Sequence, residues 1–227
     1  MSGLKLFVDR MSPVCRAVLL LLKANNVPYE EVFVDLSKGE EDTNEQLGAI
    51  NPNRRVPTMD DNGFGLFESC AILRYLCSKY NLEDHWYPKD IQARAKVEEA
   101  LDWFPGNLRC GAFRFIGLVP KRTGKPVSDE KRTEVTTILK QSLDIIENYF
   151  LKGRKFVGGD NISIADLEFV GEVQQYLLMD KDLCKGRPNM ERWMQDCKQY
   201  LAPHLDEVNQ KVYKIREAGL FVAPLDV

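Results

Sequence analysis

Hydrophobic and polar positions follow two kinds of pattern in roughly the first eighty residues. Short apolar runs predict strands, and apolar residues spaced three or four apart predict helices. A β-α-β unit of this kind implies a parallel strand pair joined by a right-handed crossover. In chain order, we expect strand Leu4–Val8, helix Val14–Ala24, strand Tyr29–Asp35, strands Val56–Met59 and Phe64–Phe67, and a helix from Ser69.

Two connections in this part of the chain have different predicted forms. The polar segment before Val56 is expected to be a loop. The last two strands flank Asp60-Asp61-Asn62-Gly63, whose turn-forming residues predict a β-hairpin. The predicted order is therefore β-α-β, a loop, and then β-β-α.

Beyond Pro88 the strand patterns nearly disappear. Residues 135–149 keep an i, i+3, i+4, i+7 apolar spacing, and Ser128 supplies a cap before them. Ser163-Ile164-Ala165-Asp166 is a second helix start, a variant capping box in which Asp166 takes the place usually held by Glu or Gln. A last helix is expected over Ala202–Ala218.

The predicted fold class is an α/β N-terminal domain followed by an all-α helical bundle domain. We place the first domain at residues 1–82, a linker at 83–89 and the helical domain at 90–227. The linker contains His85-Trp86-Tyr87-Pro88, whose proline and clustered aromatic residues suit a segment that packs across a domain boundary.

Composition and charge exclude several classes of protein. Hydrophobic residues make up 44% of the 227-residue chain and charged residues 29%, as in ordinary globular domains. No apolar stretch approaches the ~20 residues of a membrane helix, and the N-terminus lacks a signal-peptide pattern, so we expect a cytoplasmic protein without a membrane partner. The net charge of −3 argues against a nucleic-acid partner.

The six cysteines show no paired short spacing of the kind zinc sites use, so we expect reduced thiols and no metal site. Cys15 lies one turn into an apolar helix and is expected to be buried rather than nucleophilic. His85 and His204 have no serine or cysteine partner in a recognisable motif, which argues against a hydrolase triad.

Ser12 is the leading candidate for chemistry. It lies at a strand-to-helix junction, where its hydroxyl, the first helix amides and the helix dipole favour an anion such as a thiolate. A serine before a helix is also a common N-cap, and this position alone does not separate the two roles.

Two further motifs suit a peptide-like ligand. If the Val56-Pro57 bond is cis, the Val56 backbone can face outward and pair with an extended peptide. At Glu68-Ser69, a hydroxyl and free helix amides suit a carboxylate, while Glu68 suits an ammonium group. Taken singly, these motifs are also ordinary strand-start and helix-cap sequences.

The order of these motifs along the chain is more specific than any one of them. It resembles the cytosolic glutathione transferase family over nearly the whole chain, and most of all the theta class, with the delta and epsilon classes as neighbours. The motifs that carry the resemblance are Ser12-x-x-Cys15-Arg16, Asn51-Pro52-x-x-x-Val56-Pro57, Glu68-Ser69-x-Ala71-Ile72, Trp86-Tyr87-Pro88 and Ile162-Ser163-Ile164-Ala165-Asp166-Leu167.

The resemblance implies a thioredoxin-like domain that binds glutathione, a helical domain that holds a small electrophile, and a homodimer. The serine matching Ser12 then donates a hydrogen bond to the glutathione sulfur and lowers the pKa of its thiol. Glutathione is a co-substrate, and no further cofactor is expected. By position, glutathione contacts fall on Glu41, Arg55, Val56, Pro57, Glu68 and Ser69, and the electrophile site on Trp103, Arg109 and Phe113.

The chain departs from the family pattern at two places. The theta class usually carries a histidine in the loop after the second strand, where this chain has Gly39-Glu40-Glu41-Asp42. In addition, Pro13 directly follows Ser12, whereas the family more often places its proline one position later. A non-catalytic binding or scaffold module with the same fold is the alternative function, but such a module has no need of all three motifs. A glutaredoxin-like reductase is excluded because Ser12 occupies the position of the attacking cysteine.

Overall fold

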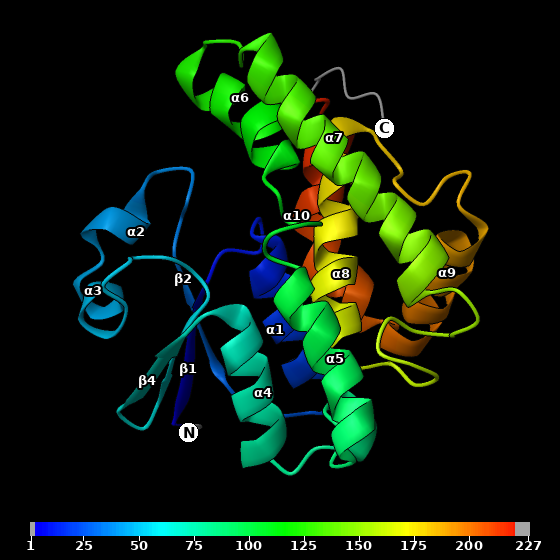
Figure 1. Ribbon diagram of the computed structural model, residues 1–227. Helices are drawn as coiled ribbons and strands as arrows, with labels where there is room; N and C mark the ends of the chain where they lie inside the picture. Colours follow the sequence, from blue (N-terminus) through cyan, green and yellow to red (C-terminus); the bar gives the residue numbers. More distant parts are fainter. Residues whose placement is uncertain (1–2, 221–227) are drawn as a thin grey trace.

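A four-stranded sheet is formed by the first part of the chain in the computed structural model, which describes residues 3–220 (Figure 1). The strand order is β2-β1-β3-β4. β1 runs parallel to β2 and antiparallel to β3, and β3 pairs antiparallel with β4. The parallel pair and the hairpin confirm the predicted β-α-β and β-β units. The strands are β1 Leu4–Val8, β2 Glu30–Phe33, β3 Thr58–Asp61 and β4 Phe64–Phe67.

The hairpin turn is shorter than predicted. β3 runs through Asp60 and Asp61, which pair with β4, so only Asn62 and Gly63 remain in the turn. Both have positive φ, 54° and 91°, as a two-residue type I′ turn requires. The strand also begins two residues later than expected, after Pro57, which has no backbone N–H to donate to a ladder.

The connection between β2 and β3 is not the plain loop that was predicted. It holds two short helices, α2 Glu40–Thr43 and α3 Glu45–Ile50. The acidic residues of α2 lie in its first turn, where the helix dipole favours negative charge. Asn44 caps α3 by accepting a hydrogen bond from Leu47 N at 2.9 Å. Helices this short have no periodic apolar pattern from which to predict them.

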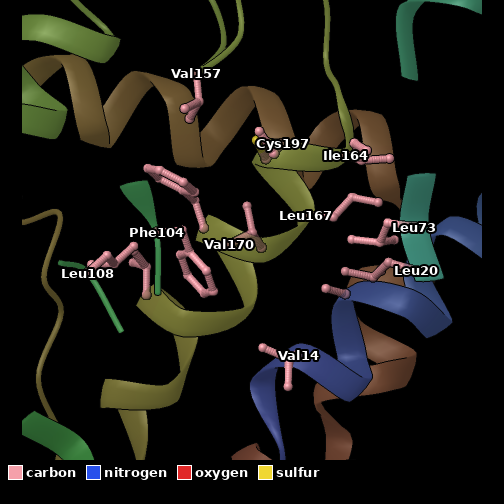
Figure 2. Packing of buried hydrophobic residues seen from close by; sticks show 14 of the residues in the cluster. Val14, Leu20, Leu73, Phe104, Leu108, Val157, Ile164, Leu167, Val170 and Cys197 are labelled. Atoms are coloured by element: carbon pink, nitrogen blue, oxygen red, sulfur yellow. The ribbon is translucent and has the colours of Figure 1, made fainter. Parts of the chain in front are cut away.

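Helices α1 Pro13–Ala24 and α4 Ser69–Lys79 pack beside the sheet, and α1 separates it from the helical part (Figure 1). α1 contacts α8 Ile164–Gln175, a central helix whose twelve residues are all buried. One continuous hydrophobic core joins these elements. Figure 2 shows Leu20 of α1, Leu73 of α4 and Leu167 of α8 meeting inside it.

The rest of the chain is helical, as predicted. The remaining elements are η1 Asp84–Trp86, α5 Ile91–Trp103, the π-helical turn η2 Phe113–Leu118, α6 Val119–Thr123, α7 Asp129–Ile145, the π-helical turn η3 Ile146–Phe150, η4 Tyr176–Met179, α9 Pro188–Leu201 and α10 His204–Glu217. α10 begins two residues later than expected, after Ala202 and Pro203. Within residues 3–220, no helix combines the length and apolar character needed to cross a membrane.

Both predicted helix starts are confirmed. Ser128 Oγ accepts a hydrogen bond from Lys131 N at 3.3 Å at the start of α7. At the start of α8, Ser163 and Asp166 form the reciprocal capping box. The buried Asp166 carboxylate also accepts hydrogen bonds from Val157 N at 2.8 Å and Trp193 Nε1 at 2.9 Å. The cap therefore also fixes α9 against α8.

Candidate active site

A cavity of about 720 Å³ lies between the carboxyl end of β1 and the helical part of the chain. Its walls come from the β1–α1 loop, the segment after β2, residues 109–118, α8 and α10. Of the predicted site residues, Ser12, Arg109 and Phe113 are brought together in this lining.

Ser12 occupies the N-cap position of α1, with φ −80° and ψ 122°, but its side chain makes no capping hydrogen bond. The backbone alone supports the turn: Ser12 N donates to Asp9 O at 2.8 Å, and Ser12 O accepts from Arg16 N at 3.2 Å. The side chain is only 8% exposed and lies at the cavity wall. Its hydroxyl is therefore not occupied in capping the helix.

Cys15, one turn further along α1, is fully buried, as expected. Burial raises the pKa of its thiol to about 12, so the thiol is neutral at physiological pH. All six cysteines lie within the described residues, and each is a free thiol.

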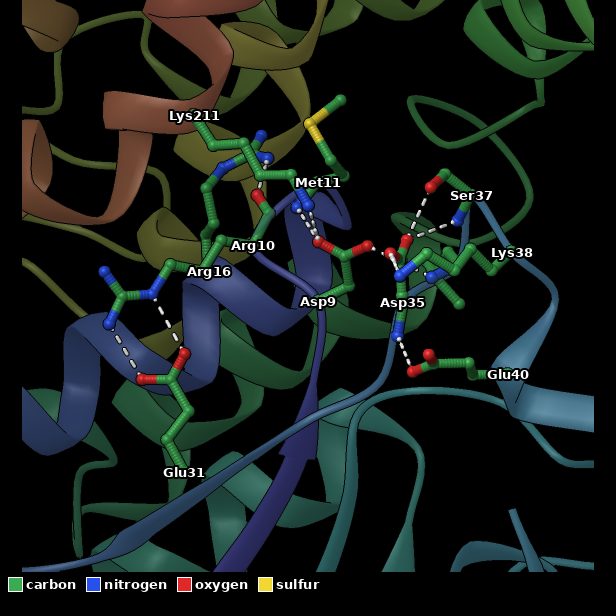
Figure 3. A network of polar contacts seen from close by, with 11 residues as sticks. Asp9, Arg10, Met11, Arg16, Glu31, Asp35, Ser37, Lys38, Glu40 and Lys211 are labelled. Atoms are coloured by element: carbon green, nitrogen blue, oxygen red, sulfur yellow. Dashed lines mark hydrogen bonds and ion pairs between the residues drawn. The ribbon is translucent and has the colours of Figure 1, made fainter. Parts of the chain in front are cut away.

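Asp9 was not predicted as a site residue, yet it organises the loop that carries Ser12. Its carboxylate is 1% exposed and accepts hydrogen bonds from Met11 N at 2.9 Å and Leu36 N at 3.3 Å. Lys211 of α10 donates a third, at 2.8 Å (Figure 3). The available sequence signal was an aspartate directly after a predicted strand, but two of its three partners, Leu36 and Lys211, are remote in the chain.

Arg16 belongs to the Ser12-x-x-Cys15-Arg16 motif, but the sequence analysis gave it no role of its own. Its side chain is fully buried and donates to Arg10 O at 2.8 Å, Gly171 O at 2.9 Å and Gln175 Oε1 at 2.7 Å. Burial lowers the pKa of Arg16 to about 10, which leaves the guanidinium charged at neutral pH. Arg16 therefore ties the first turn of α1, and with it Ser12, to α8.

The Val56–Pro57 peptide bond is cis, the isomer on which the predicted backbone pairing depends. Asn51 holds this segment in place, because its Nδ2 donates to Arg55 O and to Thr58 Oγ1, both at 3.0 Å. The Arg55 side chain is exposed and lies 3.9 Å from the Asp42 carboxylate.

Glu68 and Ser69 mark the start of α4. Glu68 is exposed and has a left-handed backbone with φ 73°, while Ser69 is 8% exposed. Behind them, Cys70 Sγ lies 3.7 Å from Oε1 of the fully buried Glu168. Burial raises the pKa of Glu168 to about 7.

Two predicted site residues have surroundings that differ from the expectation. Glu41 lies within α2 and is 7% exposed, so its carboxylate is not presented on an open acidic loop. Trp103 does not line the cavity. Its ring packs in the helical core, with its centroid 5.1 Å from that of Phe150 and 5.9 Å from that of Phe169, because the side chain points from α5 toward η3 and α8.

Arg109 and Phe113 do reach the cavity. Arg109 Nη1 donates to Glu172 Oε2 at 2.6 Å, and Phe113 meets Tyr176 edge-on with ring centroids 6.1 Å apart. Phe115, Leu118 and Met11 add apolar surface to the wall. The arrangement places a hydroxyl and a paired guanidinium at the edge of a largely apolar hollow, which suits an apolar ligand that carries or develops negative charge.

Comparison with protein families gives two matches. The N-terminal domain of glutathione S-transferase matches residues 2–78, and the C-terminal domain of the same family matches residues 93–199. Glutathione S-transferase T1 of Arabidopsis thaliana is 38% identical over 226 residues, covering 96% of this chain and 92% of the relative.

Solved structures give the same assignment. Human glutathione transferase theta-2, in complex with glutathione and an unknown ligand, superposes with a TM-score of 0.89 at 35% identity, covering 95% of this chain and 90% of that one. A human theta-class enzyme bound to the glutathione conjugate of 1-menaphthyl sulfate gives a TM-score of 0.87 at 35% identity, with coverage of 97% and 89%. Similarity of sequence and fold over nearly the full length shows that this chain is a glutathione transferase of the theta class.

Proposed function

We propose that this enzyme conjugates glutathione to small hydrophobic electrophiles and that Ser12 activates the thiol. The observation that supports this most directly is the Ser12 hydroxyl, which lines a cavity of about 720 Å³ and makes no capping hydrogen bond. The hydroxyl lies beside the buried Cys15 thiol, with which it forms a side-chain hydrogen bond, and remains at the cavity wall.

In this proposal, Ser12 donates a hydrogen bond to the glutathione sulfur. A hydrogen bond to the charged form lowers a pKa, and each unit corresponds to about 1.4 kcal/mol in favour of the thiolate. The first amides of α1 and the helix dipole add to this effect. The thiolate then attacks an electrophilic carbon, a carbon–sulfur bond forms, and the leaving group departs with its electron pair.

The remaining candidate residues are assigned to the central backbone and the two ends of glutathione. Val56, before the cis Pro57, pairs with the cysteinyl backbone, and Glu68 with Ser69 holds the γ-glutamyl end. Arg55 is exposed and meets the glycyl carboxylate. Glu41 keeps at most an indirect part in this proposal, because its side chain is buried.

Arg109 and the aromatic wall around Phe113 are assigned to the electrophile. An aromatic or alkyl group fits the apolar surface, and Arg109 stabilises a departing anion such as a halide or sulfate. The human relative bound to the conjugate of 1-menaphthyl sulfate supports an aromatic electrophile with an anionic leaving group. Peroxide reduction by the same thiolate is the other reaction class that we propose to assay.

We also propose a homodimer. Phe64 of β4 is 50% exposed and stacks on Tyr75 of α4, with ring centroids 5.1 Å apart, which gives this edge of the sheet an aromatic surface. Sedimentation of the wild type and of a Phe64→Glu variant tests it, since a charge at an apolar contact weakens association. Equal monomer content in both would contradict this contact.

Replacement of Ser12 by alanine tests the proposed function. We expect Ser12→Ala to lose more than about ninety per cent of conjugating activity at pH 7, while retention on immobilised glutathione stays near that of the wild type. Ser37→Ala is the matched control, because Ser37 lines the same cavity but its hydroxyl is bonded to Asp35 Oδ1 at 2.5 Å. Glutathione binding by the wild type without turnover of any electrophile would instead support the binding-module alternative.

A further inference from the structure

Each of the two carboxylates that line the cavity is paired with a cation. The Glu172 carboxylate is paired with Arg109 at 2.6 Å, and the Asp9 carboxylate with Lys211 at 2.8 Å. Arg114 lies with its guanidinium carbon 5.7 Å from the centroid of the Phe115 ring. The ionisable side chains that line the cavity are Asp9, Arg109, Cys110, Arg114, Lys121, Glu172 and Lys211.

Asp9 has a structural task that requires its carboxylate. The two oxygens accept from the backbone N–H groups of Met11 and Leu36, and both of these residues line the cavity. The turn that carries Ser12 starts at the same residue, because Ser12 N donates to the main-chain carbonyl of Asp9. A neutral apolar residue at position 9 would leave those amides without their acceptor.

The same carboxylate is a disadvantage for thiolate chemistry. A negative charge close to a thiol disfavours its ionised form. The Cys15 thiol beside this loop shows both influences. Burial is the main reason that its pKa is raised, hydrogen bonds with Ser12 and with the Asp9 backbone lower it, and the charge of the Asp9 carboxylate raises it. A glutathione thiol next to Ser12 would experience the same repulsion.

Lys211 supplies the compensating charge from a distant part of the chain. It lies on α10, 202 residues from Asp9, and its side chain reaches down to the carboxylate (Figure 3). Its ammonium nitrogen is also 5.1 Å from the centroid of the Phe33 ring, which holds the cation at this place by a cation–π contact. Lys211 Nζ shares the Asp9 Oδ1 acceptor with Met11 N, while Leu36 N donates to Oδ2.

We propose that Lys211 is a positioning residue whose charge neutralises Asp9, so that this carboxylate can hold the Ser12 loop without opposing thiolate formation in the cavity. The proposal rests on the proposed function of Ser12. Helix α10 would then help to set the pKa of the glutathione thiol, in addition to lining the cavity.

The test is the pKa of the glutathione thiol bound to the full-length enzyme, measured by the ultraviolet absorbance of the thiolate as a function of pH. We expect Lys211→Gln to raise this pKa by about one unit, a tenfold loss of thiolate at a pH below both values. Asp9→Asn, which leaves Lys211 uncompensated, is expected to leave the pKa at or below that of the wild type. The double variant is expected to return to within about 0.3 unit of the wild type.

Two controls separate charge from structure. Lys211→Arg keeps the charge and is expected to behave like the wild type. Lys23→Gln breaks a different contact between α1 and α10, the 3.0 Å pair with Glu207, which lies away from the cavity, and is expected to leave the thiol pKa unchanged.

A wild-type pKa in Lys211→Gln, or the same raised pKa in the double variant as in Lys211→Gln, would overturn the inference. In either case, a wild-type enzyme that conjugates glutathione and loses activity in Ser12→Ala would leave the proposed function intact. Failure of the proposed function shows differently, as a Ser12→Ala variant with wild-type activity.

Discussion

Arg109 and Glu172 form an ion pair at the cavity wall, with 2.6 Å between Nη1 and Oε2. The two partners differ in exposure, because the Glu172 side chain is 5% exposed and that of Arg109 37%. Glu172 comes from the buried helix α8, while Arg109 lies in the segment that follows α5. The pair therefore fixes this segment to the centre of the molecule and leaves one edge of the guanidinium facing the cavity.

Replacement of Arg109 by glutamine should destabilise the fold as well as weaken electrophile turnover. It leaves a buried carboxylate without its partner, a change that costs about 3 kcal/mol or more in the free energy of unfolding. Glu172→Gln should lower the free energy of unfolding by less than Arg109→Gln does. The double variant should recover part of the stability that Arg109→Gln loses. Urea unfolding followed by tryptophan fluorescence measures the three values.

The matched control for that series is Arg216→Gln, which removes a 2.7 Å pair with Asp180 between two exposed side chains. We expect it to change the free energy of unfolding by less than about 1 kcal/mol. Equal losses in Arg109→Gln and Arg216→Gln would contradict the buried character assigned to the Arg109–Glu172 pair.

Gly171 allows α8 to approach the first turn of α1. A Cβ atom at this position would lie 2.6 Å from Pro13 O, a backbone atom next to Ser12. We therefore expect Gly171→Ala to push α1 away from α8 and to destabilise the fold by about 1–3 kcal/mol, with a fall in kcat through displacement of Ser12.

Gly106→Ala is the control for this prediction, because a Cβ atom there meets nothing within 4 Å. Thermal unfolding and steady-state conjugation kinetics of both variants provide the comparison. A Gly171→Ala enzyme with the unfolding midpoint and kcat of the wild type would show that the helix contact is not limiting.

Glu168 should make stability depend on pH. Its pKa is raised by burial from 4.5 to about 7 in the folded state, so between these values the folded protein binds more protons than the unfolded chain. The contribution of Glu168 to the free energy of unfolding is therefore greatest below pH 4.5, and it is lost as the pH rises through 7. The loss is on the order of 3 kcal/mol by linkage.

Glu168→Gln removes this ionisation and keeps an oxygen for the contact with Cys70. We expect the variant to be more stable than the wild type at pH 8 and to converge with it near pH 5, where the wild-type carboxyl is protonated. Thermal unfolding at several pH values measures the difference. A constant difference across this range would contradict the raised pKa of Glu168.

Local patterns were sufficient for most of the secondary structure. The short apolar runs of β1 and β4, the apolar periodicity of α7 and the Ser163–Asp166 capping box act over a few residues, and the structure contains each of them. The errors are also local in origin. α2 and α3 are too short to show a period, and Asp60 and Asp61 have turn-like side chains but are held in β3 by pairing with β4.

The sequence by itself determined the fold class, the helix starts and the motifs around Ser12, because each depends on neighbouring residues. Only the tertiary structure decided which side chains share the cavity. It joined Arg16 to Gly171 across 155 residues and Lys211 to Asp9 across 202, and it turned Trp103 into the core. Such pairings depend on how helices pack, since the energy of a charge is set by its burial and partners rather than by its neighbours in sequence.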